Sequence, residues 1–172
     1  MRRGALLALL LAGCGATAVV DRDAGGKAVL IRSPQPDADD LADLARSEGV
    51  RTVVNLRGAA PGEPWYEEER RGVEAIGARW VQHETSGRSA PGERWVATTL
   101  ALFEDEAAWP ILVHCEGGVH RTGLVVALYR MAIQGWSAER AVEELEDEWF
   151  DWTLIDRDAI KRYLRSYRPP GH

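Results

Sequence analysis

The chain has 172 residues, of which 45% are hydrophobic, and this suits one globular domain with a sizeable core. Its net charge of −6 arises from acids and bases that are mixed along the chain, so nucleic acid is not expected as a partner. The four histidines and the scattered acids lack the spacing of metal ligands, and we expect neither a metal nor a cofactor.

The first residues have the pattern of an export signal. A short basic segment at residues 1–3 precedes an apolar run at residues 5–12, which is far shorter than the roughly 20 residues that span a bilayer. The run ends in Leu11-Ala12-Gly13-Cys14, which resembles the lipobox of bacterial lipoproteins. We therefore predict a signal peptide at residues 1–13 that is cleaved before Cys14, with an ordinary secretory signal as the alternative.

Cys14 is the predicted site of lipid attachment. A lipid on this cysteine would anchor the mature chain to a membrane surface. The resemblance implies the bacterial cell envelope, facing the periplasm, and Gly15 in place of an aspartate favours the outer over the inner membrane. Residues 14–26 are small and polar without periodicity, so we interpret them as the lipidated cysteine and a flexible tether.

Residues 27–172 are predicted to form one domain in which strands alternate with helices. Short apolar runs predict strands at residues 27–31, 51–56, 79–83 and 109–114. Helical spacing predicts helices at residues 37–48, 65–76, 93–107, 124–133 and 138–148, with a last one that starts at Asp156 or Asp158 and ends at Tyr167. The alternation predicts an α/β fold with a central, mostly parallel sheet flanked by helices. The run at residues 109–114 is apolar nearly throughout, as expected for a strand buried on both faces.

A glycine-bearing loop carries the candidate chemistry. The stretch HCEGGVHRTG at residues 114–123 joins this buried strand to the start of a helix. Backbone N–H groups at a helix start lack intrahelical partners, and Gly117 and Gly118 let them surround an anion. Arg121 adds paired donors suited to phosphate oxygens. The predicted phosphate-binding residues are Glu116, Gly117, Gly118, Val119, His120 and Arg121.

Cys115 stands at the base of this predicted anion site. If Cys14 carries a lipid, Cys115 is the single thiol of the mature chain, so its presence in an oxidising compartment points to burial or to chemistry. The positive surroundings favour a thiolate, which can attack a bound phosphate and form a cysteinyl-phosphate that water hydrolyses. Thr122 can donate its hydroxyl to the sulfur as the sulfur departs.

The arrangement Cys-x5-Arg-Thr with a preceding His114 resembles the phosphate-binding loop of the protein tyrosine phosphatase superfamily. The flanking segments 31–36, 52–57, 109–113 and 123–130 are similar to its bacterial dual-specificity-like branch. The resemblance covers residues 28–150 and implies a metal-independent phosphomonoester hydrolase that acts on a phosphorylated small molecule or phosphoprotein. In that interpretation His114 orients the loop. The ending Val119 to Gly123 is also similar to fungal and plant phosphatases of inositol pyrophosphates, which remain an alternative.

The general acid is left open by the sequence. Such an acid contributes about 10²- to 10⁴-fold to the rate. The related enzymes often supply an aspartate from the loop after the preceding strand, but residues 83–93 contain none. Glu84 is the first candidate, His83 the second and His120 the third.

Glu116 bears on the substrate. A carboxylate at the mouth of the site disfavours ligands with many negative charges, unless Arg32, Arg57 and Arg88 converge there, so we favour an aromatic or small leaving group. The missing aspartate keeps a second hypothesis open, a phosphate-binding pseudophosphatase with little turnover. A sulfurtransferase of the rhodanese type or an arsenate reductase is a third, although the mature chain lacks the second cysteine that would help a reductase.

Overall fold

The computed structural model describes residues 15–86, 89–148 and 157–169. Its strands are β1 (Ala18–Arg22), β2 (Ala28–Ser33), β3 (Thr52–Asn55), β4 (Arg79–Gln82) and β5 (Ile111–His114). Its helices are α1 (Ala38–Glu48), α2 (Pro64–Ile76), α3 (Glu93–Glu104), α4 (His120–Ala132), α5 (Ala138–Glu148) and α6 (Arg157–Ser166), with a 3-10 turn at Glu106–Ala108.

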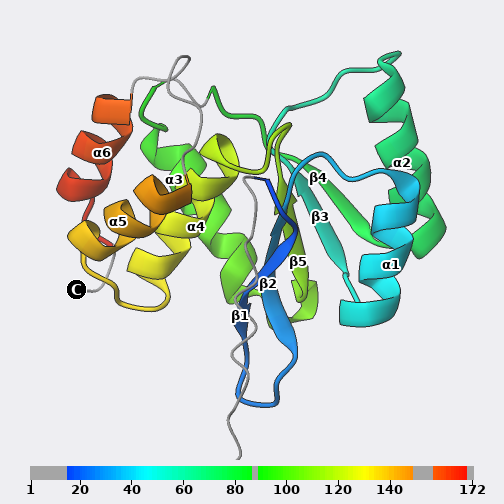
Figure 1. Cartoon of the computed structure of the whole chain (residues 1–172), viewed down its shortest axis with the longest axis horizontal. Coiled ribbons are helices and arrows are strands. Elements are labelled where there is room, and N and C mark those ends of the chain that lie inside the picture. Colours follow the sequence, from blue (N-terminus) through cyan, green and yellow to red (C-terminus); the bar gives the residue numbers. More distant parts are fainter. Residues whose placement is uncertain (1–14, 87–88, 149–156, 170–172) are drawn as a thin grey trace, which may run out of the picture.

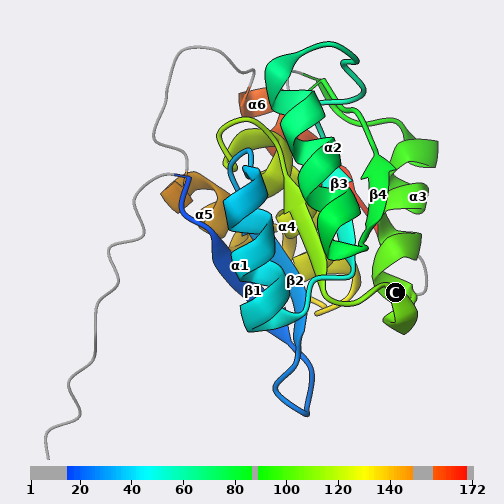
Figure 2. The same cartoon turned by 90° about the vertical axis from the view of Figure 1, so that its right-hand side faces the viewer.

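The strands form one sheet in the order β1-β2-β5-β3-β4 (Figure 1). β2, β5, β3 and β4 run parallel to one another, whereas β1 is antiparallel to β2. Helices α1 and α2 cover one face of the sheet and α3 to α6 the other (Figures 1 and 2). The predicted α/β fold with a mostly parallel central sheet is confirmed.

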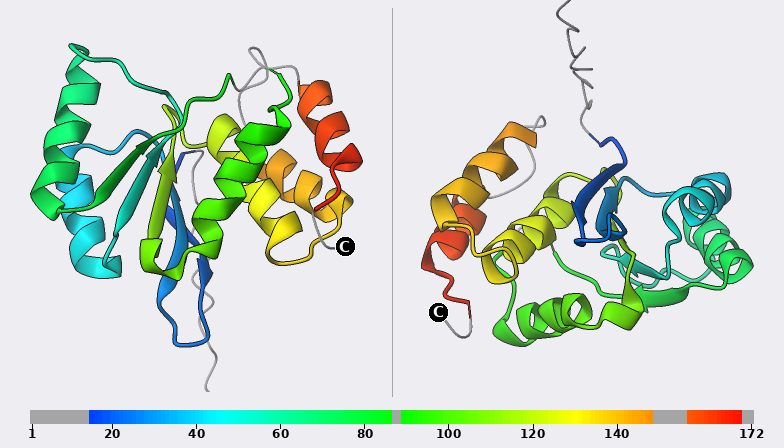
Figure 3. Two further views of the ribbon diagram at one scale, coloured as in Figure 1. Left: turned by 180° about the vertical axis from the view of Figure 1, so that it is seen from behind. Right: turned by 90° about the horizontal axis from the view of Figure 1, so that it is seen from below.

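The core lies on both faces of the three central strands. Every residue of β2, β3 and β5 is buried, and the pleat sends alternate side chains to opposite faces. Ile31, Val53 and Leu112 belong to the apolar cluster under α1 and α2, whereas Leu30 and Val54 face the larger cluster around α4. Helix α4 is buried along most of its length and lies between the sheet and helices α5 and α6 (Figure 3).

Helices α1 and α2 start where their sequences favour it. Asp37 caps α1, because its side chain accepts the N–H of Asp40 at 2.8 Å and the Asp40 carboxylate accepts the N–H of Asp37 at 3.2 Å. Pro64 stands in the first turn of α2, where its missing N–H leaves no hydrogen bond unmade. These two helices pack on the face of the sheet that holds Ile31, Val53 and Leu112.

Strand β1 corrects one prediction, because residues 14–26 are not simply a flexible tether. Ala18–Arg22 pairs with β2, and side chains of α4 hold it: the Tyr129 hydroxyl donates to Asp21 at 2.5 Å and the Arg130 guanidinium donates to the Val20 carbonyl at 3.3 Å. The sequence pattern does not reveal this strand, because it lies at the sheet edge and is only half-buried. The side chains that bond to it from α4 are also more than a hundred residues away. Cys14 and the predicted signal peptide lie outside the described residues.

Candidate active site

The candidate site lies at the edge of the sheet where β2, β3 and β5 end. Ser33 and Asn55 both pair with His114, so the segments that follow these three residues emerge side by side. Ligands of open α/β sheets bind outside the carboxyl ends of the strands. The loop that the sequence singled out, from Cys115 to Val119, is the segment that follows β5.

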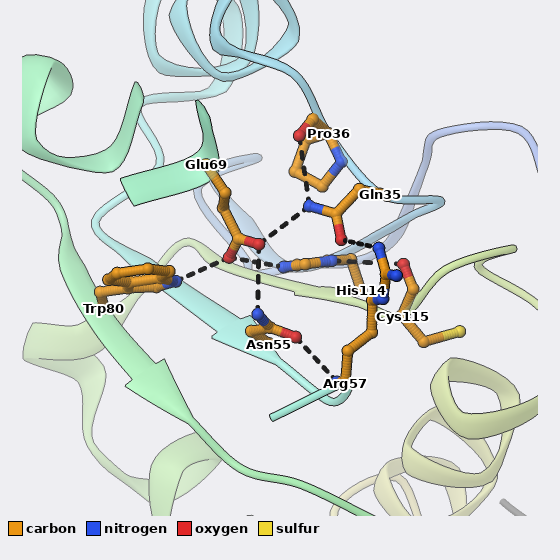
Figure 4. Close-up of polar contacts among 8 residues, drawn as sticks. All are labelled: Gln35, Pro36, Asn55, Arg57, Glu69, Trp80, His114 and Cys115. Atoms are coloured by element: carbon orange, nitrogen blue, oxygen red, sulfur yellow. Dashed lines mark hydrogen bonds and ion pairs between the residues drawn. The ribbon is translucent and has the colours of Figure 1, made fainter. Parts of the chain in front are cut away.

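Three hydrogen bonds from outside the loop hold its carbonyl groups. Arg32, buried in β2, donates to the Gly118 carbonyl at 2.7 Å, and the Gln35 N–H donates to the Glu116 carbonyl at 2.9 Å. His114 Nδ1 lies 3.3 Å from the Cys115 carbonyl (Figure 4). With their carbonyl groups held in this way, the peptide units of the loop have a fixed orientation, as an anion-binding loop requires.

The two glycines of the loop have different roles. Gly118 has a φ of +67°, and a Cβ at this position would lie 2.5 Å from the Pro34 nitrogen and 2.6 Å from the Ser33 carbonyl oxygen. No side chain fits there, because the loop packs directly on the backbone that follows β2. Gly117 is exposed, and a Cβ there would have no heavy atom within 4 Å.

Cys115, Arg121 and Thr122 come together where β5 passes into α4. Cys115 is 3% exposed, at the end of the strand. Helix α4 starts at His120 rather than at Leu124 as the periodicity indicated, so Arg121 and Thr122 stand in its first turn. Arg121 Nη1 donates to the Leu56 carbonyl at 3.5 Å. Thr122 is fully buried, and its hydroxyl has no hydrogen-bond partner among the described residues.

Glu116 is exposed and lies beside the arginine of the loop. One of its carboxylate oxygens is 4.0 Å from Arg121 Nη2. The carboxylate therefore points toward the Arg121 guanidinium and not away from it. A phosphate on Arg121 would lie close to this negative charge, and a ligand with several phosphates would be repelled more strongly than one with a single phosphate.

Glu84, the first candidate for the general acid, lies at the same edge of the sheet. It is exposed and packs against Gly58, where a Cβ would lie 2.9 Å from the Glu84 carboxyl carbon. The neighbouring Thr85 N–H donates to the Leu56 carbonyl at 3.3 Å, the same carbonyl that accepts from Arg121. The Leu56 carbonyl thus accepts hydrogen bonds both from the residue next to Glu84 and from Arg121.

The other two candidate acids have different surroundings. The His83 ring stacks on Trp95 with 4.7 Å between ring centres, and its Nε2 lies 2.7 Å from the Thr99 hydroxyl, so it faces α3. Burial lowers the pKa of His83, which favours its neutral form. His120 is half-buried at the start of α4.

A fully buried carboxylate, Glu69 of α2, is the part of the site that sequence reasoning missed. Its Oε1 accepts from Trp80 Nε1 at 2.6 Å and from His114 Nε2 at 3.0 Å. Its Oε2 accepts from Gln35 Nε2 at 2.8 Å and from Asn55 Nδ2 at 3.2 Å (Figure 4). Burial alone would raise the pKa of Glu69, but the hydrogen bond and charge of His114, with hydrogen bonds from Gln35 and Trp80, outweigh it and lower that pKa.

A pattern in the sequence pointed to Glu69, but it did not enter the prediction. Glu69 precedes Gly72 and Val73 by three and four residues, and all three are buried. This spacing places them on one face of α2. A charged residue on the buried face of an amphipathic helix needs partners, whereas its charged neighbours Glu67 and Arg70 pair with each other near the surface.

Arg57 adds a second cation to this edge of the sheet. Its Nη1 donates to Gln35 Oε1 at 2.8 Å, and its guanidinium lies 3.6 Å from the centre of the Trp65 ring. Three arginines could offset the charge of Glu116 if they met at the site. Of these, Arg57 lies at this edge, Arg32 donates to the Gly118 carbonyl, and Arg88 falls outside the described ranges.

The first described residue also lies at this edge. A Cβ on Gly15 would be 3.0 Å from the Gly117 carbonyl oxygen. Because β1 is antiparallel to β2, its first residue is at the end of the sheet from which the phosphate loop emerges. The chain thus enters the domain beside the candidate site.

No group of three or more His, Cys, Asp or Glu within the ranges given above is placed to hold a metal ion. Among the helices of those same ranges, none combines the length and the apolar character needed to cross a membrane.

A family model described as a DSP-PTPase phosphatase fused to NAD+ kinase matches residues 18–162. The chain belongs to this family of DSP-PTPase phosphatases. The match begins at β1 and includes the whole candidate site, and it confirms the resemblance to dual-specificity phosphatases.

Individual relatives agree with the family. The dual specificity protein phosphatase TpbA of Pseudomonas aeruginosa is 30% identical over 137 residues, which are 80% of this chain and 58% of TpbA. The chain thus spans little more than half the length of this curated relative. A crystal structure of TpbA in complex with phosphotyrosine has a TM-score of 0.59 at 25% identity, covering 81% of this chain and 87% of that one.

A yeast structure shares the fold. The core catalytic domain of the PP-IP phosphatase SIW14 from S. cerevisiae has a TM-score of 0.65 at 24% identity, with 81% of this chain and 80% of that chain covered. At this identity the likeness bears on the fold alone.

Proposed function

We propose that this protein is a cysteine-dependent phosphomonoester hydrolase of the dual-specificity type. The observation that carries the proposal is the loop between β5 and α4 in a chain of this phosphatase family. Cys115 is buried at its base, and its carbonyl groups accept hydrogen bonds from residues outside the loop. Arg121 lies in the first turn of α4.

The proposed reaction has two displacement steps. Loop N–H groups and the Arg121 guanidinium bind the phosphate oxygens, and the Cys115 thiolate attacks phosphorus. The bond from phosphorus to the leaving oxygen breaks, and an acid protonates that oxygen. Water then attacks the cysteinyl-phosphate, the phosphorus–sulfur bond breaks, and the thiolate and inorganic phosphate are released. Thr122, buried beside the loop, is the proposed hydroxyl donor to the departing sulfur.

Glu84 is the proposed general acid. Its contact with Gly58 places it beside the segment whose Leu56 carbonyl accepts from Arg121. His83 is the weaker candidate, because its ring is stacked on Trp95 and bonded to Thr99. A carboxylic acid at this edge of the sheet supports a working phosphatase over a phosphate-binding pseudophosphatase.

The proposed substrate is a phosphoprotein or small molecule with one phosphate on an aromatic group. TpbA has been crystallised with phosphotyrosine. The Glu116 carboxylate, 4.0 Å from Arg121, opposes a ligand that carries several phosphates. For this reason the inositol pyrophosphate alternative, which rests on the resemblance of the ending Val119 to Gly123, is the less favoured of the two.

We also propose that the protein is attached to a membrane of the bacterial envelope by a lipid on Cys14, after removal of residues 1–13. The support is the lipobox-like sequence. Because Gly15 lies beside Gly117, such an anchor would hold the candidate site close to the membrane surface, on the periplasmic side of the outer membrane. A Cys14→Ser variant should then move from the membrane fraction to the soluble fraction of the cell envelope. Retention in the membrane fraction would contradict the anchor.

The phosphatase proposal is tested with purified protein that starts at Gly15, so that β1 is retained. It should hydrolyse an aryl phosphate in the presence of a chelator, and vanadate should inhibit it. Cys115→Ser should lower kcat at least about 10³-fold, as expected when a nucleophile is removed, whereas Ser86→Ala should not. Unchanged activity of Cys115→Ser would end the proposal.

A further inference from the structure

Helix α2 reaches the site with two side chains that are four residues apart. Trp65 and Glu69 therefore lie on the same face of the helix. The Arg57 guanidinium stacks on the Trp65 ring, 3.6 Å from the ring centre. Glu69 accepts hydrogen bonds in the buried network that includes Gln35. Neither residue belongs to the phosphate loop.

The Glu69 carboxylate is saturated with hydrogen bonds. An ionised carboxylate has about four acceptor positions, and Trp80, His114, Gln35 and Asn55 supply four donors from four different segments. A glutamine at this position has an oxygen at only one end. Its amide group would face two donors at the other end, so at least two of the four hydrogen bonds would be lost.

One arm of this network leads to the nucleophile. His114 lies between Glu69 and the Cys115 carbonyl, with Nε2 at 3.0 Å from the carboxylate and Nδ1 at 3.3 Å from the carbonyl. Both neighbours are acceptors, so each of the two hydrogen bonds requires a proton on the ring nitrogen that faces it. The carboxylate thereby sets the plane of the imidazole, and the imidazole holds the peptide unit that follows Cys115.

The second arm leads to Arg57. The Gln35 side chain donates to Glu69 Oε2 at 2.8 Å and accepts from Arg57 Nη1 at 2.8 Å. Its backbone N–H also donates to the Glu116 carbonyl in the loop at 2.9 Å. The amide of Gln35 is held in one orientation, because its donor end faces the carboxylate and its acceptor end faces the guanidinium (Figure 4).

We propose that Glu69 is a positioning residue that sets the nucleophile loop through His114 and sets Arg57 through Gln35, and that Arg57 binds an acidic group next to the substrate phosphate. This inference rests on the proposed function. It names a specificity element, because Arg57 is half-buried beside the loop and only one of its guanidinium donors is used by Gln35. Trp65 and Gln35 hold the guanidinium in place, so little side-chain freedom is lost when an acidic group binds.

The test compares Glu69→Gln with Glu67→Gln, the same change two residues earlier on the same helix. Glu67 is partly exposed and pairs with Arg70, so its change should alter kcat and KM on 4-nitrophenyl phosphate by less than about twofold. Glu69→Gln should lower kcat on the order of 10²-fold through misplacement of the loop. Circular dichroism must show both variants folded at the assay temperature. Equal kcat and KM for the two folded variants would overturn the first arm.

The second arm is tested with Gln35→Leu, which cuts the link from Glu69 to Arg57 and leaves His114 in place. The substrates are two phosphotyrosine peptides that differ only in a glutamate or an alanine beside the phosphotyrosine. The variant should raise KM for the glutamate peptide about fivefold more than for the alanine peptide, as expected for one partly exposed charge pair. An equal change in KM for both peptides would overturn this arm. If Glu69→Gln does not fold, the Gln35→Leu experiment decides the inference.

Failure of the proposed function gives a different result. In that case the native protein would turn over none of the substrates. Binding is then read from the protection that inorganic phosphate gives Cys115 against iodoacetamide. Glu69→Gln should need a higher phosphate concentration for half-protection than Glu67→Gln, and equal concentrations would overturn the inference.

Discussion

The Arg32 guanidinium donates to the Gly118 carbonyl oxygen at 2.7 Å, so that strand β2 holds the loop that follows strand β5. Arg32 is 6% exposed, and the residues that follow it, Ser33 and Pro34, are the backbone on which Gly118 packs. The same strand therefore both supports the loop and bonds to it. Arg32 thus contacts the loop through its backbone, at the Gly118 carbonyl.

Arg32→Lys should keep the charge but weaken the hydrogen bond, because a lysine side chain is shorter and its ammonium nitrogen stops short of the position of the arginine Nη2. We expect kcat/KM on an aryl phosphate to fall by about tenfold or more, since a small displacement of the loop misplaces the nucleophile. Arg51→Lys, at an exposed position, is the matched control. Equal kinetics of the two variants would show that the loop keeps its shape without Arg32.

Gly118→Ala and Gly117→Ala form a matched pair within the loop. Alanine at position 118 must adopt a φ of +67° and would press on backbone atoms 2.5 and 2.6 Å away. The left-handed conformation and the overpacking together should lower the free energy of unfolding by about 2–5 kcal/mol. Gly117→Ala should change it by less than about 0.5 kcal/mol. Urea denaturation of both variants checks this, and equal midpoints would contradict the packing described for Gly118.

Glu84→Gln should remove the proposed acid. On a substrate with a poor leaving group kcat should fall about 10²- to 10⁴-fold. The loss should be smaller on 4-nitrophenyl phosphate, because nitrophenolate departs without a proton. Ser86→Ala is the control. If His120→Ala reproduces this leaving-group dependence and Glu84→Gln does not, the acid is His120.

His83 makes the stability of the fold depend on pH. Burial lowers its pKa in the folded chain, so the unfolded chain binds the proton first as the pH falls through about 6.5. The neutral His83 ring therefore contributes its full share to the free energy of unfolding above about pH 6.5. That share is lost as the pH falls from there toward the lower pKa of the folded chain. His83→Phe keeps the stacking on Trp95 but cannot titrate. The free energy of unfolding should therefore fall less for His83→Phe than for the native chain between about pH 7 and pH 5. Parallel curves would contradict the burial of His83.

Tyr129→Phe tests the docking of β1. The substitution removes the hydroxyl that donates to Asp21 at 2.5 Å and leaves that half-buried carboxylate without this donor. We expect a loss of about 1–3 kcal/mol in the free energy of unfolding. Tyr66→Phe, in a side chain that packs on Trp80 on the other face of the sheet, is the control. A loss no larger than the control's would mean that β1 is held by its strand pairing alone.

The sequence alone predicts the alternation of strands and helices and the position of the candidate nucleophile. Both depend on residues close together in the chain: the apolar run of β5, the glycines after it, and the six-residue interval from Cys115 to Arg121. Local backbone preferences and the period of apolar residues act over such short distances. The start of α4 was placed four residues late, because His120 to Gly123 read as loop from their composition.

The distant groups that contact this loop follow from the three-dimensional fold and not from local sequence. Glu69 belongs to a charged helical segment, and its burial follows from contacts with Gln35, Asn55, Trp80 and His114, which the sheet brings together from separate segments. Strand β1 pairs with β2, and its Asp21 and Val20 also bond to side chains of α4 more than a hundred residues away. Side-chain hydrogen bonds between distant segments leave no periodic pattern, so their partners become visible only when the strand order β1-β2-β5-β3-β4 is known.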